Sequence, residues 1–415
     1  MSKEVVTLIL AGGEGVRLRP LTETRCKPAI SFGGEYRIID IAISNAINSG
    51  FNEIYVLSQF LAASLNDYLK KTYPPHRDAP LHLEILSPEV SPIKEPLYKG
   101  TADAVRKNLK AFASHPVEYF IILSGDQIYS MDLKEMLDFA KKTDADVTIA
   151  TLPVGEEEAK RMGVLKIDSH FEVVDFFEKP ATKETLLKYA IAPDIARKHK
   201  ALHDLSFLGS MGIYIFKRKA LLDLLEEDPR EDFGKHLIPT QLKKGKTYAY
   251  IFSGYWEDIG TITSYYHATL KLTKNPASLN LYKNHPAIHI ETDRLPKAHI
   301  GNTEIFDSIV CDGSIIAAKT ITHSMIGRKT LIEEGTSIKD SIVMGSSPLS
   351  PYPPTHIGKN CLIEKAIIDE GAYLGDHVRL LNEKKERSFE SKDLVIQDGI
   401  IVVKAGARLP SHFSI

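Results

Sequence analysis

The sequence predicts an α/β protein in two parts: a Rossmann-like domain with a mostly parallel sheet, followed by a left-handed parallel β-helix. Three observations lead to this prediction. Over residues 1 to about 270, short β-branched or aromatic runs alternate with segments of helical spacing. A segment without periodicity follows, with prolines at 276, 286 and 296, and beyond it aliphatic residues recur every six positions. The length of 415 residues accommodates two or three domains at about 100 to 200 residues each.

The first part is predicted to consist of βαβ units. Stretches of helical spacing, such as Leu61–Lys71 and Lys134–Lys142, separate the strand candidates. Helical connections of this kind are typical of a mostly parallel sheet covered by helices on both faces. We assign residues 1–275 to this domain and 276–296 to a linker. The strand candidates are Val5–Leu10, Glu53–Leu57, Tyr119–Leu123, Val147–Leu152, Met211–Phe216 and Thr247–Phe252.

Residues 297–415 carry the six-residue repeat. A period of six is neither helical nor that of a plain strand, and it indicates a β-helix whose coils point one aliphatic residue inward at each of three turns. We expect this domain to serve oligomerisation and regulation. An acyl-transfer site in the coils, with His299, His323, His356 or His377 as general base, is the alternative. The repeating residues are Ile309, Ile315, Ile321, Ile326, Ile332, Ile338, Ile357, Ile363, Ile368, Leu374 and Leu380.

Composition restricts the partners and the compartment. The formal net charge is −2 and the isoelectric point about 6.7, so the chain lacks the basic character of proteins that bind nucleic acid or anionic membranes. Its cysteines, Cys26, Cys311 and Cys361, are odd in number and far apart, which argues against a disulfide framework or a zinc site. The apolar run at Val5–Leu10 is too short for a signal peptide or a membrane span. We expect a cytoplasmic protein.

A glycine-rich turn and nearby cations form the first candidate site. The strand predicted at Val5–Leu10 runs into Gly12-Gly13-Glu14-Gly15, where exposed backbone N–H groups can hold a phosphate or a base edge. The turn matches neither the P-loop nor the G-x-G-x-x-G pattern. Arg17, Arg25 and Lys27 follow closely, and such residues neutralise polyphosphates. A plain tight turn and solvated surface cations are the alternative reading.

Acidic residues at strand ends form the second candidate. Asp126 follows the strand predicted at Tyr119–Leu123, and Asp258 follows Tyr255-Trp256-Glu257. Two carboxylates that converge suit Mg²⁺, which favours one or two carboxylates together with substrate phosphates. Glu178 and Lys179 stand before Pro180, where a strand must end and one side chain can turn to a ligand. Turn or N-cap aspartates and exposed edge charges are the alternatives.

Seven segments together resemble a known family, and the likeness covers nearly the whole chain. They are Leu10-Ala11-Gly12-Gly13-x-Gly15-x-Arg17-Leu18, Lys27-Pro28-Ala29, Phe32-Gly33-Gly34-x-Tyr36-Arg37-Ile38-Ile39-Asp40, Ser44-Asn45-x-Ile47-Asn48-Ser49-Gly50, Gly100-Thr101-Ala102-Asp103-Ala104-Val105-Arg106, Ser210-Met211-Gly212-Ile213-Tyr214 and Tyr255-Trp256-Glu257-Asp258-Ile259-Gly260-Thr261. This set resembles the glucose-1-phosphate adenylyltransferase family of sugar-phosphate nucleotidyltransferases, which make ADP-glucose for glycogen or starch synthesis.

The resemblance implies a role for each matching position. A phosphate oxygen of glucose 1-phosphate would attack the α-phosphorus of ATP in line and expel pyrophosphate, with Mg²⁺ as cofactor. No protein nucleophile is needed, so catalysis would consist of positioning and charge neutralisation. Arg17, Lys27 and Asp126 would be catalytic, and Asp126 and Asp258 would hold the metal. ATP would contact Ala11, Gly12, Gly13, Gln59, Gly100 and Thr101; glucose 1-phosphate would contact Gly163, Glu178, Lys179 and Ser210.

The chain departs from the family pattern at four places. Leu97 replaces a tryptophan and Gln127 a histidine, and we expect these changes to alter the substrate response without abolishing activity. Thr24 and Ala405 stand where the family has effector-binding lysines, so we expect weak activation by phosphorylated effectors. The resemblance also implies a homotetramer. The alternatives are a catalytically silent regulatory subunit of the same fold and a nucleotidyltransferase that uses UTP or dTTP.

Overall fold

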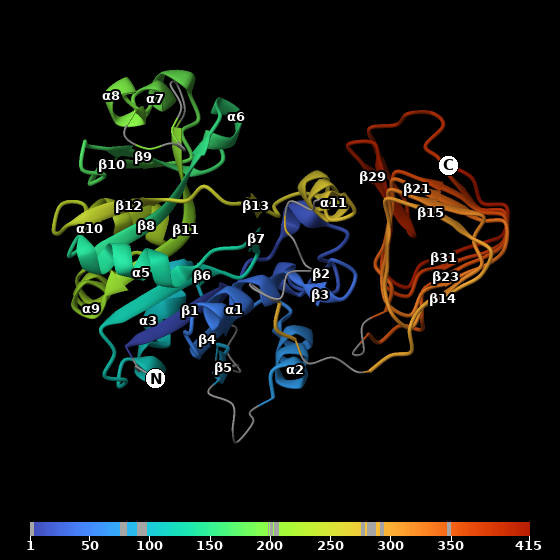
Figure 1. The fold of residues 1–415 in the computed structure, drawn as a ribbon, viewed down its shortest axis with the longest axis horizontal. Helices are drawn as coiled ribbons and strands as arrows, with labels where there is room; N and C mark the ends of the chain where they lie inside the picture. Colours follow the sequence, from blue (N-terminus) through green and yellow to red (C-terminus); the bar gives the residue numbers. More distant parts are fainter. Residues whose placement is uncertain are drawn as a thin grey trace.

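The computed structural model describes residues 4–74, 81–88, 98–197, 199, 202, 207–274, 279, 288–290, 294–346 and 350–415. An α/β domain and a β-helix lie next to each other (Figure 1), which confirms the predicted two-part architecture. Most of the predicted linker at 276–296 lies outside the described residues, and so does Leu97.

A nine-stranded sheet forms the centre of the α/β domain, with a main path β10-β9-β11-β6-β1-β4-β5 and with β8 and β12 attached to β11. The pairings of β1 with β4 and β6, and of β4 with β5, are parallel, as predicted. Around β11 the sheet becomes antiparallel. The strands are β1 (Val5–Ala11), β4 (Glu53–Ser58), β5 (His82–Leu86), β6 (Tyr119–Ser124), β8 (Val147–Val154), β9 (Gly163–Ile167), β10 (Val173–Glu178), β11 (Phe207–Lys217) and β12 (Thr247–Ile251).

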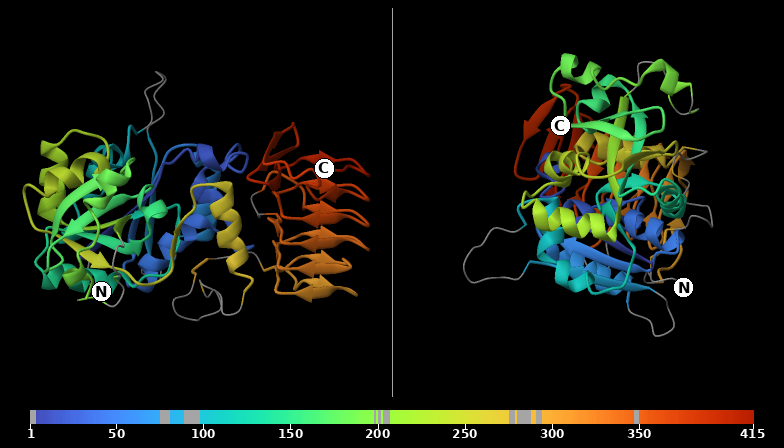
Figure 2. Two further views of the ribbon diagram at one scale, coloured as in Figure 1. Left: turned by 90° about the horizontal axis from the view of Figure 1, so that it is seen from above. Right: turned by 90° about the vertical axis from the view of Figure 1, so that its left-hand side faces the viewer.

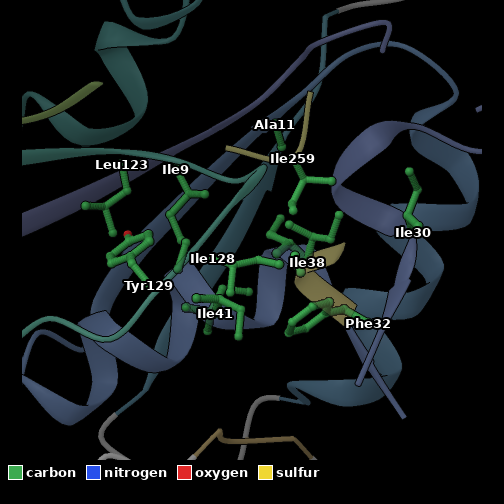
Figure 3. Packing of buried hydrophobic residues seen from close by; sticks show 14 of the residues in the cluster. Ile9, Ala11, Ile30, Phe32, Ile38, Ile41, Leu123, Ile128, Tyr129 and Ile259 are labelled. Atoms are coloured by element: carbon green, nitrogen blue, oxygen red, sulfur yellow. The ribbon is translucent and has the colours of Figure 1, made fainter. Parts of the chain in front are cut away.

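Both faces of this sheet are buried. Successive side chains of a strand point to opposite faces, and in β6 Ile121 and Leu123 join one apolar cluster while Phe120 and Ile122 join another. Figure 3 shows part of the first cluster, with Leu123 near Tyr129. The helices that accompany the sheet are α1 (Ile38–Asn48), α2 (Ala62–Thr72), α3 (Thr101–Lys107), α4 (Leu109–Phe112), α5 (Leu133–Lys142), α6 (Glu156–Ala159), α7 (Lys183–Leu187), α8 (Pro193–Ala196), α9 (Arg218–Glu227), α10 (Ile238–Gln241) and α11 (Ile262–Lys271).

Several short elements lie near the carboxyl ends of β1 and β6 or beside the sheet. Two of them, β7 and β13, form a separate antiparallel pair, and β2 pairs with β3. These elements are η1 (Val16–Leu18), η2 (Lys27–Ala29), β2 (Ser31–Phe32), β3 (Tyr36–Arg37), β7 (Gln127–Tyr129), η3 (Phe233–Leu237) and β13 (Trp256–Asp258).

The second domain is a stack of coils whose short strands line up in three parallel columns (Figure 2). An antiparallel excursion, β28-β29-β30, extends the third column. The first column contains β14 (His299–Ile300), β17 (Ile315–Ile316), β20 (Leu331–Ile332), β23 (His356–Ile357), β26 (Tyr373–Leu374) and β31 (Arg408–Leu409); the second, β15 (Glu304–Phe306), β18 (Thr320–Thr322), β21 (Ser337–Lys339), β24 (Leu362–Glu364) and β27 (Arg379–Leu380); the third, β16 (Ile309–Val310), β19 (Met325–Ile326), β22 (Ile342–Val343), β25 (Ala366–Ile368), β28 (Ser388–Glu390), β29 (Leu394–Gln397) and β30 (Ile400–Val403).

The inward ladder follows the predicted repeat from Ile321 onward but differs at its start. Ile315 is 54% exposed, and its neighbour Ile316 is the buried residue that pairs in register with Ile332. Likewise Val310, next to Ile309, packs against the coil core. Both two-residue strands are aliphatic at both positions, so the six-residue spacing alone could not select the inward one. The expectation for Ile309 and Ile315 was therefore wrong by one residue.

The third column of the β-helix packs against the α/β domain. Its outward residues Met325, Ile342 and Ile367 belong to the same buried cluster as residues of β1 and α1. Tyr266 of α11 donates a hydrogen bond to Asp340 O at 2.5 Å. A continuous apolar core therefore holds the two domains together. In the part of the chain that the structure describes, no helix combines the length and apolar character that a bilayer crossing needs.

Candidate functional site

The glycine-rich turn after β1 leaves its backbone open to a ligand. Gly15 has φ 67°, a left-handed conformation that glycine adopts without strain. Its carbonyl accepts a hydrogen bond from Thr22 Oγ1 at 2.9 Å, which fixes the turn. Gly13 is exposed, and a Cβ added there would meet no atom within 4 Å. Space for a phosphate or a nucleobase therefore exists above Gly13.

Gln59, in the turn after β4, lies against this loop. Its Nε2 donates to Gly12 O at 3.1 Å, while its Oε1 is buried and has no hydrogen-bond partner among the described residues. An unsatisfied buried acceptor is unfavourable unless a ligand supplies a donor. The amide oxygen of Gln59 is thus available for an N–H donor of a bound base. Parallel pairing of β1 with β4 places Ala11 opposite Ser58 and so brings these two turns together.

Asp126 and Asp258 meet because two strands pair after the main sheet has ended. The turn after β6 is fixed by a hydrogen bond from Gly125 N to Leu10 O at 2.9 Å. The next strand, β7, pairs with β13, and Gln127 lies opposite Asp258 in their register. This pairing puts the carboxylates of Asp126 and Asp258 side by side, 132 positions apart in the chain. Ser124 Oγ donates a hydrogen bond to Asp126 Oδ1.

Lys27 lies between these two carboxylates. Its Nζ is 2.7 Å from Asp126 Oδ2 and 3.1 Å from Asp258 Oδ1. Burial alone would lower the pKa of Lys27, but the two carboxylates raise it above its ordinary value. Burial likewise opposes ionisation of Asp126, yet Lys27 and Ser124 bring its pKa below the ordinary value. Lys27 and Asp126 are therefore both charged at neutral pH.

Arg17 lies beside Asp258, at the solvent-exposed edge of this cluster. Its side chain is exposed, and a Cβ added to Gly260 would lie 3.2 Å from Arg17 Nη2 and 3.1 Å from Asp258 Oδ2. Arg25, the third cation of this region, lies elsewhere. It is buried against Asp369 and Glu370 of the β-helix, so the expectation that it joins Arg17 and Lys27 at a polyphosphate was wrong.

A second group of predicted residues lies where β9 pairs with β10. Gly163 stands opposite Glu178, and a Cβ on Gly163 would lie 2.4 Å from the Phe176 ring and 2.8 Å from Glu178 Oε2. Only glycine fits this close approach. Lys179 Nζ is 3.3 Å from Glu178 Oε1, and the Lys179 side chain is 65% exposed. Burial raises the pKa of Glu178, although Lys179 opposes the effect.

Ser210 lies in β11, where the register with β8 shifts between Ser210 and Tyr214. Gln127 Nε2 donates to the carbonyl of the next residue, Met211, at 2.7 Å, and Gln127 Oε1 accepts from Trp256 Nε1 at 3.1 Å. Gln127, a departure from the family pattern, thus fixes β7 to β11 and β13. The strand that follows Asp126 is therefore joined to β11, which carries Ser210.

Gly100 and Thr101 pack against the segment before η3, which contributes a residue that sequence reasoning missed. Thr101 Oγ1 donates to Asp232 Oδ2 at 3.3 Å, and a Cβ on Gly234 would lie 2.9 Å from Glu178 Oε2 and 3.6 Å from Asp232 Oδ1. Asp232 therefore places a second carboxylate near Glu178. Its sequence signal, an aspartate three residues before Lys235, predicts only the helix cap that it forms by accepting from Lys235 N at 2.8 Å.

The acidic pair fits Mg²⁺ by its donor chemistry. Oxygens of Asp126 and Asp258 both reach one point, which Lys27 Nζ now contacts, and Mg²⁺ takes one or two carboxylates together with substrate phosphates. Within the described ranges no group of three or more His, Cys, Asp or Glu side chains is placed to hold a metal. A phosphate-bearing substrate would have to complete the coordination.

Two family models match the chain. The first is described as nucleotidyl transferase and matches residues 6–275. The second is described as the GLGC left-handed parallel beta-helix domain and matches residues 294–413, so the β-helix is of the left-handed kind predicted. The nucleotidyl transferase match covers every candidate site residue named above. The chain therefore belongs to the nucleotidyl transferase family, and its combination of domains is the signature of the glucose-1-phosphate adenylyltransferase family.

Proposed function

We propose that this protein transfers the adenylyl group of ATP to glucose 1-phosphate, giving ADP-glucose and pyrophosphate with Mg²⁺ as cofactor. The convergence of Asp126 and Asp258 on Lys27 Nζ, at 2.7 and 3.1 Å, carries the proposal. A carboxylate pair beside an ammonium group and an open glycine-rich turn suits metal-assisted transfer of a nucleotidyl group. The family membership supports this reaction class.

Each residue has a role in the proposed reaction. Arg17, exposed next to Asp258, and Lys27 would neutralise the triphosphate and the negative charge that develops on the departing pyrophosphate. Mg²⁺, held by Asp126 and Asp258, would supply further neutralisation when bound. The sugar phosphate would meet Lys179, and Glu178 would accept hydrogen bonds from sugar hydroxyls. A phosphate oxygen of glucose 1-phosphate would be the nucleophile, so the positioning of the two substrates would provide the rate enhancement.

Gln59 supports ATP over UTP or dTTP. Its unpartnered Oε1 is an acceptor, and adenine presents an exocyclic amine as donor. Uracil and thymine present a carbonyl oxygen at the corresponding position, which would leave two acceptors facing each other. A site built around a hydrogen bond discriminates strongly against a ligand that leaves a buried polar group unpaired.

Pyrophosphate release from glucose 1-phosphate with ATP, UTP, dTTP and GTP tests the proposal. We expect the highest kcat/KM with ATP, and in Gln59→Met a loss of ATP selectivity with little change in the KM for glucose 1-phosphate. A higher kcat/KM with UTP or dTTP would refute the ADP-glucose assignment. If none of the four triphosphates gave pyrophosphate, the result would favour the silent regulatory subunit. The charged residues that such a subunit would lack are all present, namely Arg17, Lys27, Asp126, Lys179 and Asp258.

We also propose that the enzyme works as a homotetramer in the cytoplasm, without nucleic-acid or membrane partners. The proposal rests on the family resemblance and on the near-neutral net charge of −2. Light scattering on the purified chain measures the mass directly. A monomer with full activity would contradict the tetramer.

A further inference from the structure

A buried ion cluster joins the catalytic domain to the β-helix. Arg25 Nη2 donates to both carboxylate oxygens of Asp369 at 2.5 Å, and Arg25 Nη1 forms an ion pair with Glu370 Oε1 at 2.9 Å. Arg25 Nε donates to Leu21 O at 3.1 Å. None of the three charged side chains is more than 6% exposed. The guanidinium group therefore binds its own loop and the β-helix at the same time.

This cluster lies close to the catalytic ammonium group. Arg25 precedes Lys27 by two residues, and Cys26 between them is 1% exposed. The short helix η2 begins at Lys27 and is closed by a hydrogen bond from Ala29 N to Cys26 O at 3.0 Å. Few backbone torsions separate the two cations, so a shift of the Arg25 backbone would move the Lys27 backbone with it.

The cluster also has the physical properties of a rigid clamp. Nη2 of Arg25 contacts both oxygens of Asp369 while Nη1 contacts Glu370, so the two arms of the guanidinium group are held by different carboxylates, and this fixes its orientation. Removing one partner of a buried ion pair leaves an uncompensated charge, so the pair is hard to open. Glu370 adds a second carboxylate to the same guanidinium, and Tyr265 OH of α11 donates to Ser31 O at 2.8 Å beyond η2. The segment is thus held on both sides of Lys27.

We propose that Arg25 is a positioning residue, which uses Asp369 and Glu370 of the β-helix to set the position of Lys27 against Asp126 and Asp258. The β-helix thereby contributes to the nucleotidyl-transfer site without touching it. This inference rests on the proposed function. It assigns Arg25 to an internal contact and not to a ligand.

Full-length variants test the clamp through a kinetic split. In Asp369→Ala we expect kcat to fall by about 10- to 100-fold, the range typical of a catalytic group displaced by about 1 Å, while the KM for glucose 1-phosphate changes less than threefold. Arg25→Lys, which keeps the charge but has a single nitrogen for the two carboxylates, should have a kcat between those of wild type and Arg25→Ala. The matched control is Glu23→Gln, which removes a partly exposed contact of the same loop with Lys404 and should leave kcat unchanged.

Replacing the whole ion cluster by apolar residues distinguishes a positioning role of Arg25 from a purely structural one. Arg25→Met combined with Asp369→Leu and Glu370→Met removes the buried charges together, and replacement of a buried ion cluster by apolar residues of similar volume is often neutral for stability. The proposal requires low kcat in this variant even when its melting temperature equals that of wild type. Wild-type kcat in a stable triple variant would overturn the proposal.

Hydrogen exchange gives a readout that does not depend on the activity. In Asp369→Ala, the amides of Ala29 and Ile30 should exchange at least tenfold faster than in wild type, while those of β6 stay protected. Unchanged exchange at Ala29 and Ile30 would overturn the clamp. Wild type that releases no pyrophosphate from any triphosphate would instead refute the proposed function, and the exchange result would still decide the clamp.

Discussion

Replacing Lys27 with methionine should destabilise the metal-free protein, because Lys27 neutralises two facing carboxylates. Oxygens of Asp126 and Asp258 both lie within 3.1 Å of Lys27 Nζ, so they are no more than about 6 Å apart, and two unit charges at that distance repel by about 3 kcal/mol at an effective dielectric constant of about 20. The Asp258 side chain is 46% exposed, and solvent screening reduces the expected loss to about 1 to 2 kcal/mol.

Thermal denaturation in EDTA measures this loss. For a domain of about 250 residues, about 1 to 2 kcal/mol corresponds to a decrease in Tm of about 2 to 8 °C. Millimolar Mn²⁺ or Mg²⁺ should restore most of it in Lys27→Met, because a divalent cation bound by the native state replaces the missing charge and stabilises by mass action. The restoration should be smaller in wild type, where the ammonium group already occupies the space between the carboxylates.

Two comparisons can refute this reasoning. The double variant Lys27→Met with Asp126→Asn retains only one carboxylate, so its Tm in EDTA should be higher than that of Lys27→Met alone. An equal or lower Tm in the double variant would mean that the loss comes from packing and not from repulsion. A Tm of Lys27→Met that matches wild type and does not respond to metal would refute the counter-ion role of Lys27.

Four further predictions concern the metal site, the sugar phosphate, one buried acid and the response to phosphorylated effectors. Asp126→Asn should lower kcat by orders of magnitude with the fold unchanged, since a neutral amide is a poor Mg²⁺ ligand, whereas Lys179→Ala should act mainly on the KM for glucose 1-phosphate; steady-state kinetics that give equal kcat losses and unchanged KM values would contradict these roles. Burial raises the pKa of Asp40 to about 6 despite hydrogen bonds from Tyr68, Arg37 N and Tyr73. The native state then binds the Asp40 proton more tightly than the unfolded state does, so the stability that this proton contributes below about pH 4 is lost as the pH rises through about 6. In urea titrations, the free energy of unfolding of Asp40→Asn should therefore rise by about 2 kcal/mol relative to wild type between pH 4.5 and 7.5. A difference that does not depend on pH would contradict this prediction. Fructose 1,6-bisphosphate and 3-phosphoglycerate should stimulate initial rates less than tenfold, because Thr24 and Ala405 carry no charge and Arg25 already binds Asp369 and Glu370; a larger stimulation by either would refute this.

Local patterns were enough to predict the architecture. Alternation of apolar runs with helical segments predicted β1, β4, β6, β8, β11 and β12 but not β5 or β9, and the predicted Val5–Leu10 agrees with β1 to within one residue. The antiparallel placement of β11 could not be predicted, because a buried strand has the same apolar composition in either direction. At the β-helix, Ile315 and Ile316 are both aliphatic, so the inward register there depended on the stacking of the coils.

The convergence of two acidic residues could be predicted from the strands at whose ends they lie. Asp126 and Asp258 were expected to converge because strand ends gather at one edge of a sheet, and the pairing of β7 with β13 brings them together. Asp232 could not be found this way, since its local signal is that of a helix cap. The contact of Arg25 with Asp369 spans 344 residues, and no local pattern encodes such a pair.

The three cations that follow the glycine-rich turn show why composition alone misassigns roles. In the sequence Arg17, Arg25 and Lys27 form one basic group suited to a polyphosphate. In the structure Arg17 is exposed beside Asp258, Lys27 is buried between two carboxylates, and Arg25 is turned to the β-helix. A buried cation must be paired, and the partners of the three cations differ: Lys27 is paired with Asp126 and Asp258, and Arg25 with Asp369 and Glu370. Under the proposed function, the exposed Arg17 would meet the triphosphate directly, whereas Arg25 would act only through the segment that carries Lys27.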